Sequence, residues 1–281
     1  MNKIKPISFF ALAAGIVTCA CAALGQESLY EQFRGHNTAM KAVQPTWMGP
    51  LIQPDSRFTQ LLRLSFSNSY TPSGAQTVNY GNYHTVGVIA NNRMQFNFMA
   101  PPYVQNNSAA VKDGFGDAMV EAKYRIASGN AAHGNFALTA LACYSVPTGS
   151  YQNGAPSGVW YPTVAVGKMW GRFDLQTTLG GMMPTGRIWA QGRQIQWNTT
   201  GQMLVGTKLW LDLEDNANYN YGGPLDGTTE NFLTPAAFYV VKRKAWKPAH
   251  AIFVPGVGMQ IATSRFHPYN HNLIPELRVL F

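Results

Sequence analysis

The sequence predicts an all-β fold, a transmembrane antiparallel β-barrel of about twelve strands preceded by a short N-terminal non-barrel segment. Three observations predict it. Only 12% of the 281 residues are charged, whereas soluble domains average roughly 25%. No stretch after residue 25 approaches the roughly 18 to 20 consecutive apolar residues of a membrane-spanning helix. Several stretches instead alternate apolar and polar side chains over about ten residues, which is typical of strands in an outer-membrane barrel.

Backbone hydrogen bonding explains why such strands should close on themselves. Inside lipid every N–H and C=O group needs a protein partner, and a closed barrel provides one for each because it has no free edge. The length suits one such barrel as a single domain. A soluble all-β protein is the alternative that this composition leaves open.

Residues 1 to 25 have the pattern of a secretory signal peptide. Lys3 and Lys5 precede an apolar stretch over residues 7–17, and small residues follow it up to Gly25. An N-terminal membrane anchor is the alternative, but the apolar stretch is short for one.

The cysteines bear on the same segment. Cys19 and Cys21 suggest a lipoprotein as a further alternative, although neither has the usual preceding sequence. Cleavage of the signal peptide would leave Cys143 alone, so the mature chain would contain no internal disulfide.

The net charge is +8, and +6 without Lys3 and Lys5. A basic excess can serve anionic lipid or nucleic acid. The basic residues are scattered singly instead of forming the cluster that nucleic-acid binding requires. We therefore expect outer-membrane lipid as a partner and no nucleic acid.

The clearest strand pattern runs from Asp117 to Ser128. One face carries Ala118, Val120, Ala122, Tyr124 and Ile126, and the other carries Glu121, Lys123 and Arg125. A helix would scatter the apolar residues around its circumference, so a period of two predicts a strand.

The last segment, from residue 273 to 281, repeats this alternation and ends on Phe281. An alternating strand with a terminal aromatic residue resembles the C-terminal signal that the barrel-assembly machinery recognises in outer-membrane proteins. We therefore interpret Phe281 as an assembly signal and the barrel-assembly machinery as a partner.

Scanning for the same period gives about twelve strands, an even number, as expected when both termini lie in the periplasm. Their centres are Leu64, Val86, Phe96, Ala122, Ala140, Val166, Thr177, Gly201, Leu211, Ala237, Pro255 and Leu277. Long connections rich in Pro, Gly, Asn and Ser are expected near 101–114, 147–160, 184–194, 218–230 and 263–271. Tight connections near Asn91, Gly171 and Gly206 fall between them, whereas the link over 242–248 is longer. Short periplasmic turns alternating with long outer loops are typical of such barrels.

Three parts of the chain follow from these patterns. Residues 1–25 are the signal peptide, residues 26–60 form an N-terminal segment, and residues 61–281 form the barrel. Because residues 26–60 show no alternation, this segment could plug the lumen, cap the periplasmic mouth or be disordered.

The assumed register directs a set of polar side chains, of mixed charge, into the barrel. The candidates for lining the lumen are Arg63, Glu121, Lys123, Arg125, Asp174, Gln176, Asp212, Glu214, Glu276 and Arg278. Buried charges need partners or water, so the lumen is either a wet pore or an interior filled by ion pairs. About twelve strands enclose more space than side chains alone fill, which favours a pore, occluded or open.

No residues indicate an enzyme. His267 and His271 lie close together, but no carboxylate or Cys stands at ligand spacing from them, and no Ser and His are singled out as a catalytic pair. The sequence therefore predicts no catalytic residues, no metal and no cofactor.

Several motifs, each short, follow one another in a specific order from about residue 60 onward. They span residues 100–103 (APPY), 114–117 (GFGD), 123–125 (KYR), 146–149 (VPTG), 167–171 (GKMWG), 173–177 (FDLQT), 232–235 (FLTP) and 258–281. In these the chain resembles the outer-membrane transporters of the MetA pathway of phenol degradation. The resemblance implies a barrel that transports aromatic or other apolar compounds. We expect a channel for passive uptake of a small solute; the alternatives are a non-conducting structural or adhesive barrel and a lipid-modifying outer-membrane enzyme.

Overall fold

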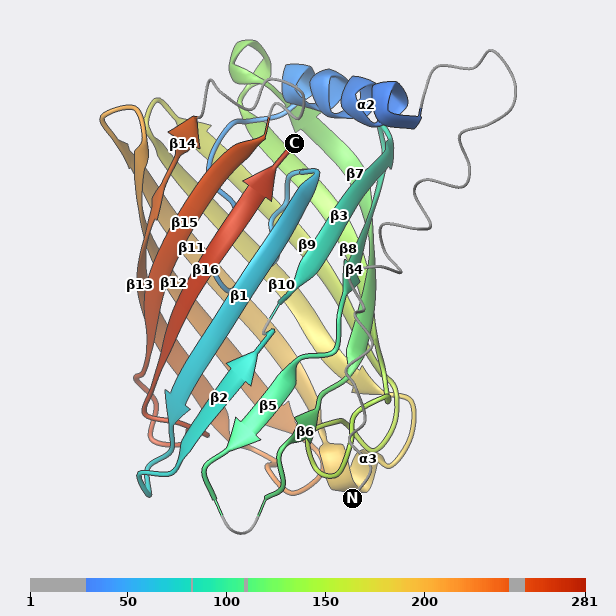
Figure 1. Cartoon of the computed structure of the whole chain (residues 1–281), viewed down its shortest axis with the longest axis vertical. Coiled ribbons are helices and arrows are strands. Elements are labelled where there is room, and N and C mark those ends of the chain that lie inside the picture. Colours follow the sequence, from blue (N-terminus) through green and yellow to red (C-terminus); the bar gives the residue numbers. More distant parts are fainter. Residues whose placement is uncertain (1–28, 82, 109–110, 243–250) are drawn as a thin grey trace, which may run out of the picture.

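The computed structural model describes residues 29–81, 83–108, 111–242 and 251–281; the expected signal peptide and most of the link over 242–248 lie outside these ranges. The described strands form one closed antiparallel β-barrel (Figure 1). The strands are β1 Leu61–Tyr70, β2 Gln76–Tyr80, β3 Thr85–Asn91, β4 Met94–Met99, β5 Tyr103–Asn106, β6 Gly114–Phe115, β7 Ala118–Gly129, β8 Phe136–Val146, β9 Val159–Trp170, β10 Phe173–Pro184, β11 Arg193–Val205, β12 Leu209–Tyr221, β13 Thr229–Tyr239, β14 Val241–Lys242, β15 Ile252–Ala262 and β16 His271–Leu280. The helices are α2 Leu29–Val43, the 3-10 turn η1 Ala131–His133 and α3 Ile188–Gln191.

Twelve of the described strands complete the ring, which confirms the predicted fold. They are β1, β3, β4, β7 to β13, β15 and β16, and the ring closes where β16 pairs with both β1 and β15. Each predicted strand centre falls within one of these twelve. The remaining four strands continue strands of the ring. Strands β2, β5 and β6 are the outer parts of β3, β4 and β7, and β14 continues β13 along β15.

The predicted loops over 101–114 and 218–230 are partly strand. The first contains β5, and the second contains the end of β12, which continues to Tyr221. The sequence of these strand ends is rich in Asn and Tyr, which are also frequent in loops, so the apolar pattern weakens before the hydrogen-bonded ladder ends.

Alternate side chains point to opposite faces of each strand, as the period of two requires. On β7, Val120 and Tyr124 are exposed on the outer face, whereas Lys123 and Arg125 are buried. Exposed aromatic rings at the two ends of the strands, such as Trp160 and Trp170 of β9, match the girdles of membrane barrels. No helix in the described part of the chain is long and apolar enough to cross a membrane.

Val120 tests this register. Its Cα pairs with Phe98 of β4 and Tyr144 of β8, so the side chain lies in the middle of an apolar outer face. We expect Val120→Arg to lower the free energy of unfolding by about 2 to 4 kcal/mol, the cost of a cation at the bilayer midplane. The measurement is urea unfolding in lipid vesicles. Glu121→Gln is the matched control on the inner face, and an equal loss there would show that the register is wrong.

The short connections and the C-terminus lie at one end of the barrel, and the long connections lie at the other (Figure 1). This arrangement agrees with the predicted alternation of short periplasmic turns and long outer loops. Helix α2 lies across the end with the short turns. There the side chain of His36 bonds to the Ile89 carbonyl at 3.0 Å, and the amide of Asn130 bonds to the Ala42 carbonyl at 2.8 Å.

Phe281 lies at the same end and contacts the N-terminal part of the chain. Its backbone N–H donates to the Gln60 carbonyl at 3.1 Å, and its ring lies edge-on to Phe33 with centroids 5.9 Å apart. We expect deletion of Phe281 to reduce the amount of folded barrel in the outer membrane, seen as loss of the fast-migrating form on unheated gels. Phe33→Ala removes the same ring contact and leaves the terminal residue in place. If both variants lose folded barrel equally, Phe281 acts through this contact and not as an assembly signal.

Candidate functional site

The lumen is occupied by the chain itself. Residues 44–60, here called the inserted segment, run from α2 into the barrel and back to the start of β1. Trp47, Leu51 and Phe58 are each at most 1% exposed. Trp47, Met48 and Leu51 pack against an apolar part of the inner wall formed by Trp210, Phe238, Val254 and Ile274. Burial of a side chain such as Leu51 contributes about 1.5 to 3 kcal/mol.

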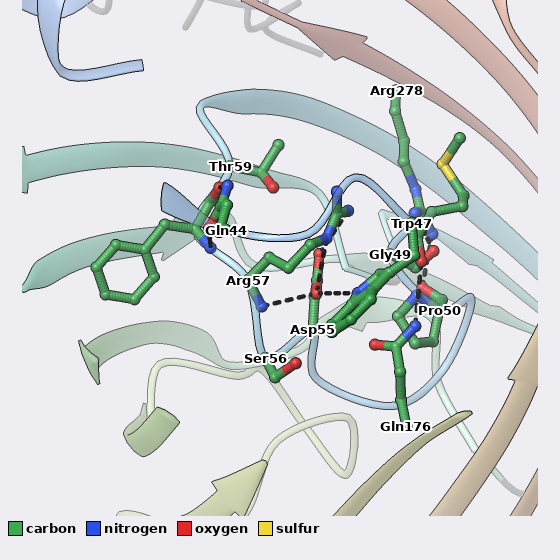
Figure 2. A network of polar contacts seen from close by, with 12 residues as sticks. Gln44, Trp47, Gly49, Pro50, Asp55, Ser56, Arg57, Thr59, Gln176 and Arg278 are labelled. Carbon is green, nitrogen blue, oxygen red and sulfur yellow. Dashed lines mark hydrogen bonds and ion pairs between the residues drawn. The ribbon is translucent and has the colours of Figure 1, made fainter. Parts of the chain in front are cut away.

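Backbone carbonyls of the inserted segment are bound by cations of the barrel wall. Arg278 donates to the carbonyls of Gly49 and Pro50, the latter at 2.7 Å, as Figure 2 shows. Arg63 donates to the carbonyl of Leu51. A segment without secondary structure carries unpaired carbonyls into a buried place, and these guanidinium groups satisfy them.

Lys123 and Thr139 bind the second half of the segment in the same way. The ammonium nitrogen of Lys123 lies 2.6 Å from the carbonyl oxygens of both Asp55 and Arg57. The Thr139 hydroxyl donates to the Ser56 carbonyl at 2.5 Å. Three consecutive carbonyls are therefore fixed by two neighbouring strands, β7 and β8.

Glu214 of β12 binds backbone N–H groups. Its carboxylate accepts hydrogen bonds from the backbone N–H groups of Leu51, of Ile52 at 3.0 Å and of Gln53 at 3.0 Å. Glu214 is fully buried. Hydrogen bonds from amides to a carboxylate are stronger than those between neutral groups, so this one side chain holds the turn of the segment.

The inserted segment also has internal bonds. The carboxylate of Asp55 accepts from the backbone N–H of Arg57 at 2.9 Å and pairs with its guanidinium at 3.0 Å, and the indole N–H of Trp47 points at it from 3.4 Å (Figure 2). Burial raises the pKa of Asp55, but the positive charges of Arg57 and Lys123, together with the hydrogen bonds from Arg57, hold the pKa below its ordinary value. Asp55 therefore stays ionised.

Gln44 and Arg125 fix the entrance of the segment. The Gln44 amide exchanges two hydrogen bonds with the backbone of Phe58, at 2.7 and 3.0 Å, which joins the two ends of the segment. Arg125 donates to the Gln44 carbonyl oxygen, and its guanidinium carbon lies 4.1 Å from the centre of the Phe58 ring.

Gly167 makes room for Trp47. A Cβ at this position of β9 would lie 2.8 Å from two atoms of the indole ring, closer than van der Waals contact allows. Any other residue would displace the ring. This glycine opens the motif GKMWG of residues 167–171.

The other sequence-predicted lumen residues lie nearby. Glu276 is buried between Arg63 and Arg278, with N to O distances of 2.6 and 2.5 Å. Gln176 donates to the Met48 carbonyl at 3.3 Å and to Asp174 at 2.9 Å. Asp212 is 5% exposed. Glu121 accepts from the Asn97 amide of the neighbouring strand at 2.6 Å.

The two histidines singled out by the sequence make other contacts. His267 is bonded to the Ser264 carbonyl at 2.8 Å, and His271 stacks on Tyr70 with ring centroids 5.0 Å apart. In the described ranges, no group of three or more His, Cys, Asp and Glu side chains could hold a metal ion.

A cavity of about 720 Å³ remains between the inserted segment and the end with the long loops; we call it the vestibule. Its inner boundary is formed by residues 49–59, and Tyr269 of the β15–β16 loop lies at its outer side. Amide and hydroxyl side chains predominate on its walls, among them Asn79, Asn97, Asn198, Asn218, Gln260 and Asn272. Sequence reasoning missed these uncharged residues, although they stand on the polar faces of alternating strands.

Solved structures of a porin and of an outer-membrane channel share this fold. No protein-family model and no curated protein matches the chain. A structure described as the NanC porin matches with a TM-score of 0.51 and 10% identity, covering 78% of this chain and 98% of that one. The COG4313 outer membrane channel from Pseudomonas putida F1 matches with a TM-score of 0.51 and 15% identity, covering 84% and 100%.

At these identities the likeness concerns the fold, which is that of outer-membrane barrels. Together with the closed ring and the apolar outer face, it places the chain in the bacterial outer membrane.

Proposed function

We propose that this chain is an outer-membrane channel for passive uptake of a small solute, and that the inserted segment closes it at rest. The observation that carries the proposal is the vestibule, which ends at residues 49–59 instead of continuing through the barrel. A barrel with a merely structural task needs no such cavity. Nor does it need wall cations directed at a segment without secondary structure.

Three parts of the chain have distinct tasks in this proposal. Residues 1–25 direct export, residues 26–60 cap and plug the barrel, and residues 61–281 form its wall. The inserted segment, which is the plug, is held through its backbone by four residues of the wall: Arg63, Lys123, Glu214 and Arg278. A polar backbone can exchange its wall partners for water, so this type of attachment is compatible with opening.

The solute class admits two candidates. The family resemblance implies aromatic or apolar compounds, and the rings of Tyr83, Tyr161, Phe232 and Tyr269 at the vestibule favour an aromatic one. The amide and hydroxyl groups on the same walls favour a solute that forms hydrogen bonds. A solute without any polar group would leave these groups unpaired on entry, at a cost of about 1 to 3 kcal/mol for each.

Planar-bilayer recording of the full chain tests the proposal. A channel closed by the inserted segment should show long closed periods interrupted by discrete conductance steps. A structural or adhesive barrel should stay silent over many insertions, as should a lipid-modifying enzyme. Silence in preparations whose folding is proven by heat-modifiable migration on gels would contradict the proposal.

A further inference from the structure

We propose that the vestibule binds a neutral solute carrying several hydroxyl groups, of the size of a mono- or disaccharide. The inference rests on the proposed function and names the class of solute. It follows from three properties of the vestibule: unused amide groups, cations that are already bound, and one stacked aromatic pair.

The first property is a set of buried amide atoms that face the vestibule without a protein partner. Gln53 of the inserted segment is 3% exposed, and neither its amide nitrogen nor its carbonyl oxygen has a hydrogen-bond partner among the described residues. The carbonyl oxygens of Asn79 and Asn272 also lack one there. All three residues line the vestibule. Buried polar atoms in native proteins are nearly always paired, so these atoms are suited to binding a solute.

The chemistry of these groups matches hydroxyls. An amide offers both a donor and an acceptor, and a hydroxyl likewise donates one hydrogen bond and accepts others. Gln53 from the plug, Asn79 from β2 and Asn272 from β16 approach the cavity from three different elements. A solute with hydroxyls on several sides can satisfy all three at once.

The second property excludes an acidic solute. Each of the four cationic side chains that line the vestibule already has a partner: Arg57 has Asp55, Arg63 and Arg278 share Glu276, and Lys123 holds two carbonyls. Glu121 and Glu230 line the same space and are bonded to the amides of Asn97 and Asn220. A carboxylate solute would meet the carboxylates of Glu121 and Glu230, and to gain a cation it would have to break an ion pair or the bonds of Lys123 to the backbone.

The third property is an apolar surface next to the amides. The rings of Phe232 and Tyr269 are stacked with centroids 4.7 Å apart, and the Tyr269 hydroxyl is fixed by Gln260 at 2.7 Å. Both rings line the vestibule. The C–H face of a pyranose packs on such rings while its hydroxyls reach amides. A volume of about 720 Å³ lies within the roughly 300 to 1,000 Å³ of small-molecule sites.

Isothermal titration of the full, detergent-solubilised chain tests the proposal, with sucrose, sodium gluconate and catechol as probes. We expect saturable binding of sucrose and none of gluconate. Gln53→Met keeps the length of the side chain and removes its amide, so it should weaken sucrose binding about five- to tenfold, the effect of one lost hydrogen bond. Gln202→Met is the matched control, because Gln202 is equally buried but does not line the vestibule.

The outcomes separate this inference from the proposed function, because binding to the vestibule requires no conduction. Sucrose binding that Gln53→Met weakens and Gln202→Met preserves would support the inference. Saturable catechol binding without sucrose binding would overturn it in favour of the aromatic candidate. Equal effects of the two variants, or no binding of sucrose to a folded protein that conducts ions, would also overturn it and leave the channel proposal standing.

Discussion

Deletion of residues 29–57 should turn the barrel into a permanently open pore. The ring closes through β1 and β16 without the deleted part, and a barrel of this size is wider than its wall side chains can fill. We therefore expect single-channel conductance of long duration, about tenfold or more above the time-averaged conductance of the full chain. Planar bilayers are the measurement, with gel migration showing that the variant is folded.

This deletion should also lower the stability of the barrel, and this effect can be measured separately. The inner wall around Trp210, Phe238 and Ile274 loses its apolar cover, so the variant should unfold at lower urea concentration. Shortening α2 alone, by deletion of residues 29–36, is the matched control, because it leaves the inserted segment in place. If the two deletion variants conduct equally, helix α2 closes the channel and the inserted segment does not.

Glu214→Leu should shift the closed channel strongly towards open states. The change removes the acceptor of three backbone N–H groups of the inserted segment. Hydrogen bonds to a charged group are worth about 1.5 to 3 kcal/mol each. A net loss of about 3 kcal/mol, after water replaces part of them, raises the ratio of open to closed time about a hundredfold.

Two variants control this result. Glu214→Gln keeps one acceptor oxygen, so we expect a smaller increase in open time. Glu121→Gln removes an inward-facing charge that contacts Asn97 and not the segment, and open time should not change. An increase for Glu121→Gln as large as that for Glu214→Leu would indicate a general loss of lumen charge instead of release of the plug.

The sequence predicts the barrel well because lipid imposes a simple pattern. Wherever a strand crosses the membrane, its outer face must be apolar, and the alternation of Val120 and Tyr124 with Glu121, Lys123 and Arg125 follows directly. Strand β5 lies within residues 101–114, which the sequence predicts as a loop because Pro, Asn and Gly are frequent there.

The inserted segment could not be located from the sequence for a different reason. Its contacts to the wall are made by its own backbone, so the identity of residues 49–53 carries little sign of Glu214, Arg63 or Arg278. The mixed charges of the inner wall were predicted to line a pore or to pair with one another. In the structure Arg63, Glu276 and Arg278 do pair, whereas Lys123 and Glu214 bind the backbone of the plug. Two features of the sequence alone indicate that the segment approaches the wall closely. They are Gly167 and the stretch around Trp47, which shows no alternation.

A reversible tether between plug and wall tests the central claim most directly. The Thr139 hydroxyl donates to the Ser56 backbone carbonyl at 2.5 Å, which keeps the two Cα atoms within roughly 7 Å, the reach of a disulfide. The double change Ser56→Cys and Thr139→Cys, in a chain with Cys143→Ser and Glu214→Leu, should conduct when reduced and close when oxidised. Each single cysteine variant serves as a control and should conduct under both conditions. Closure that reverses on reduction is the expected result, whereas equal conductance of the oxidised and reduced double variant, with the disulfide proven by mass spectrometry, would contradict the role of residues 44–60 as the plug.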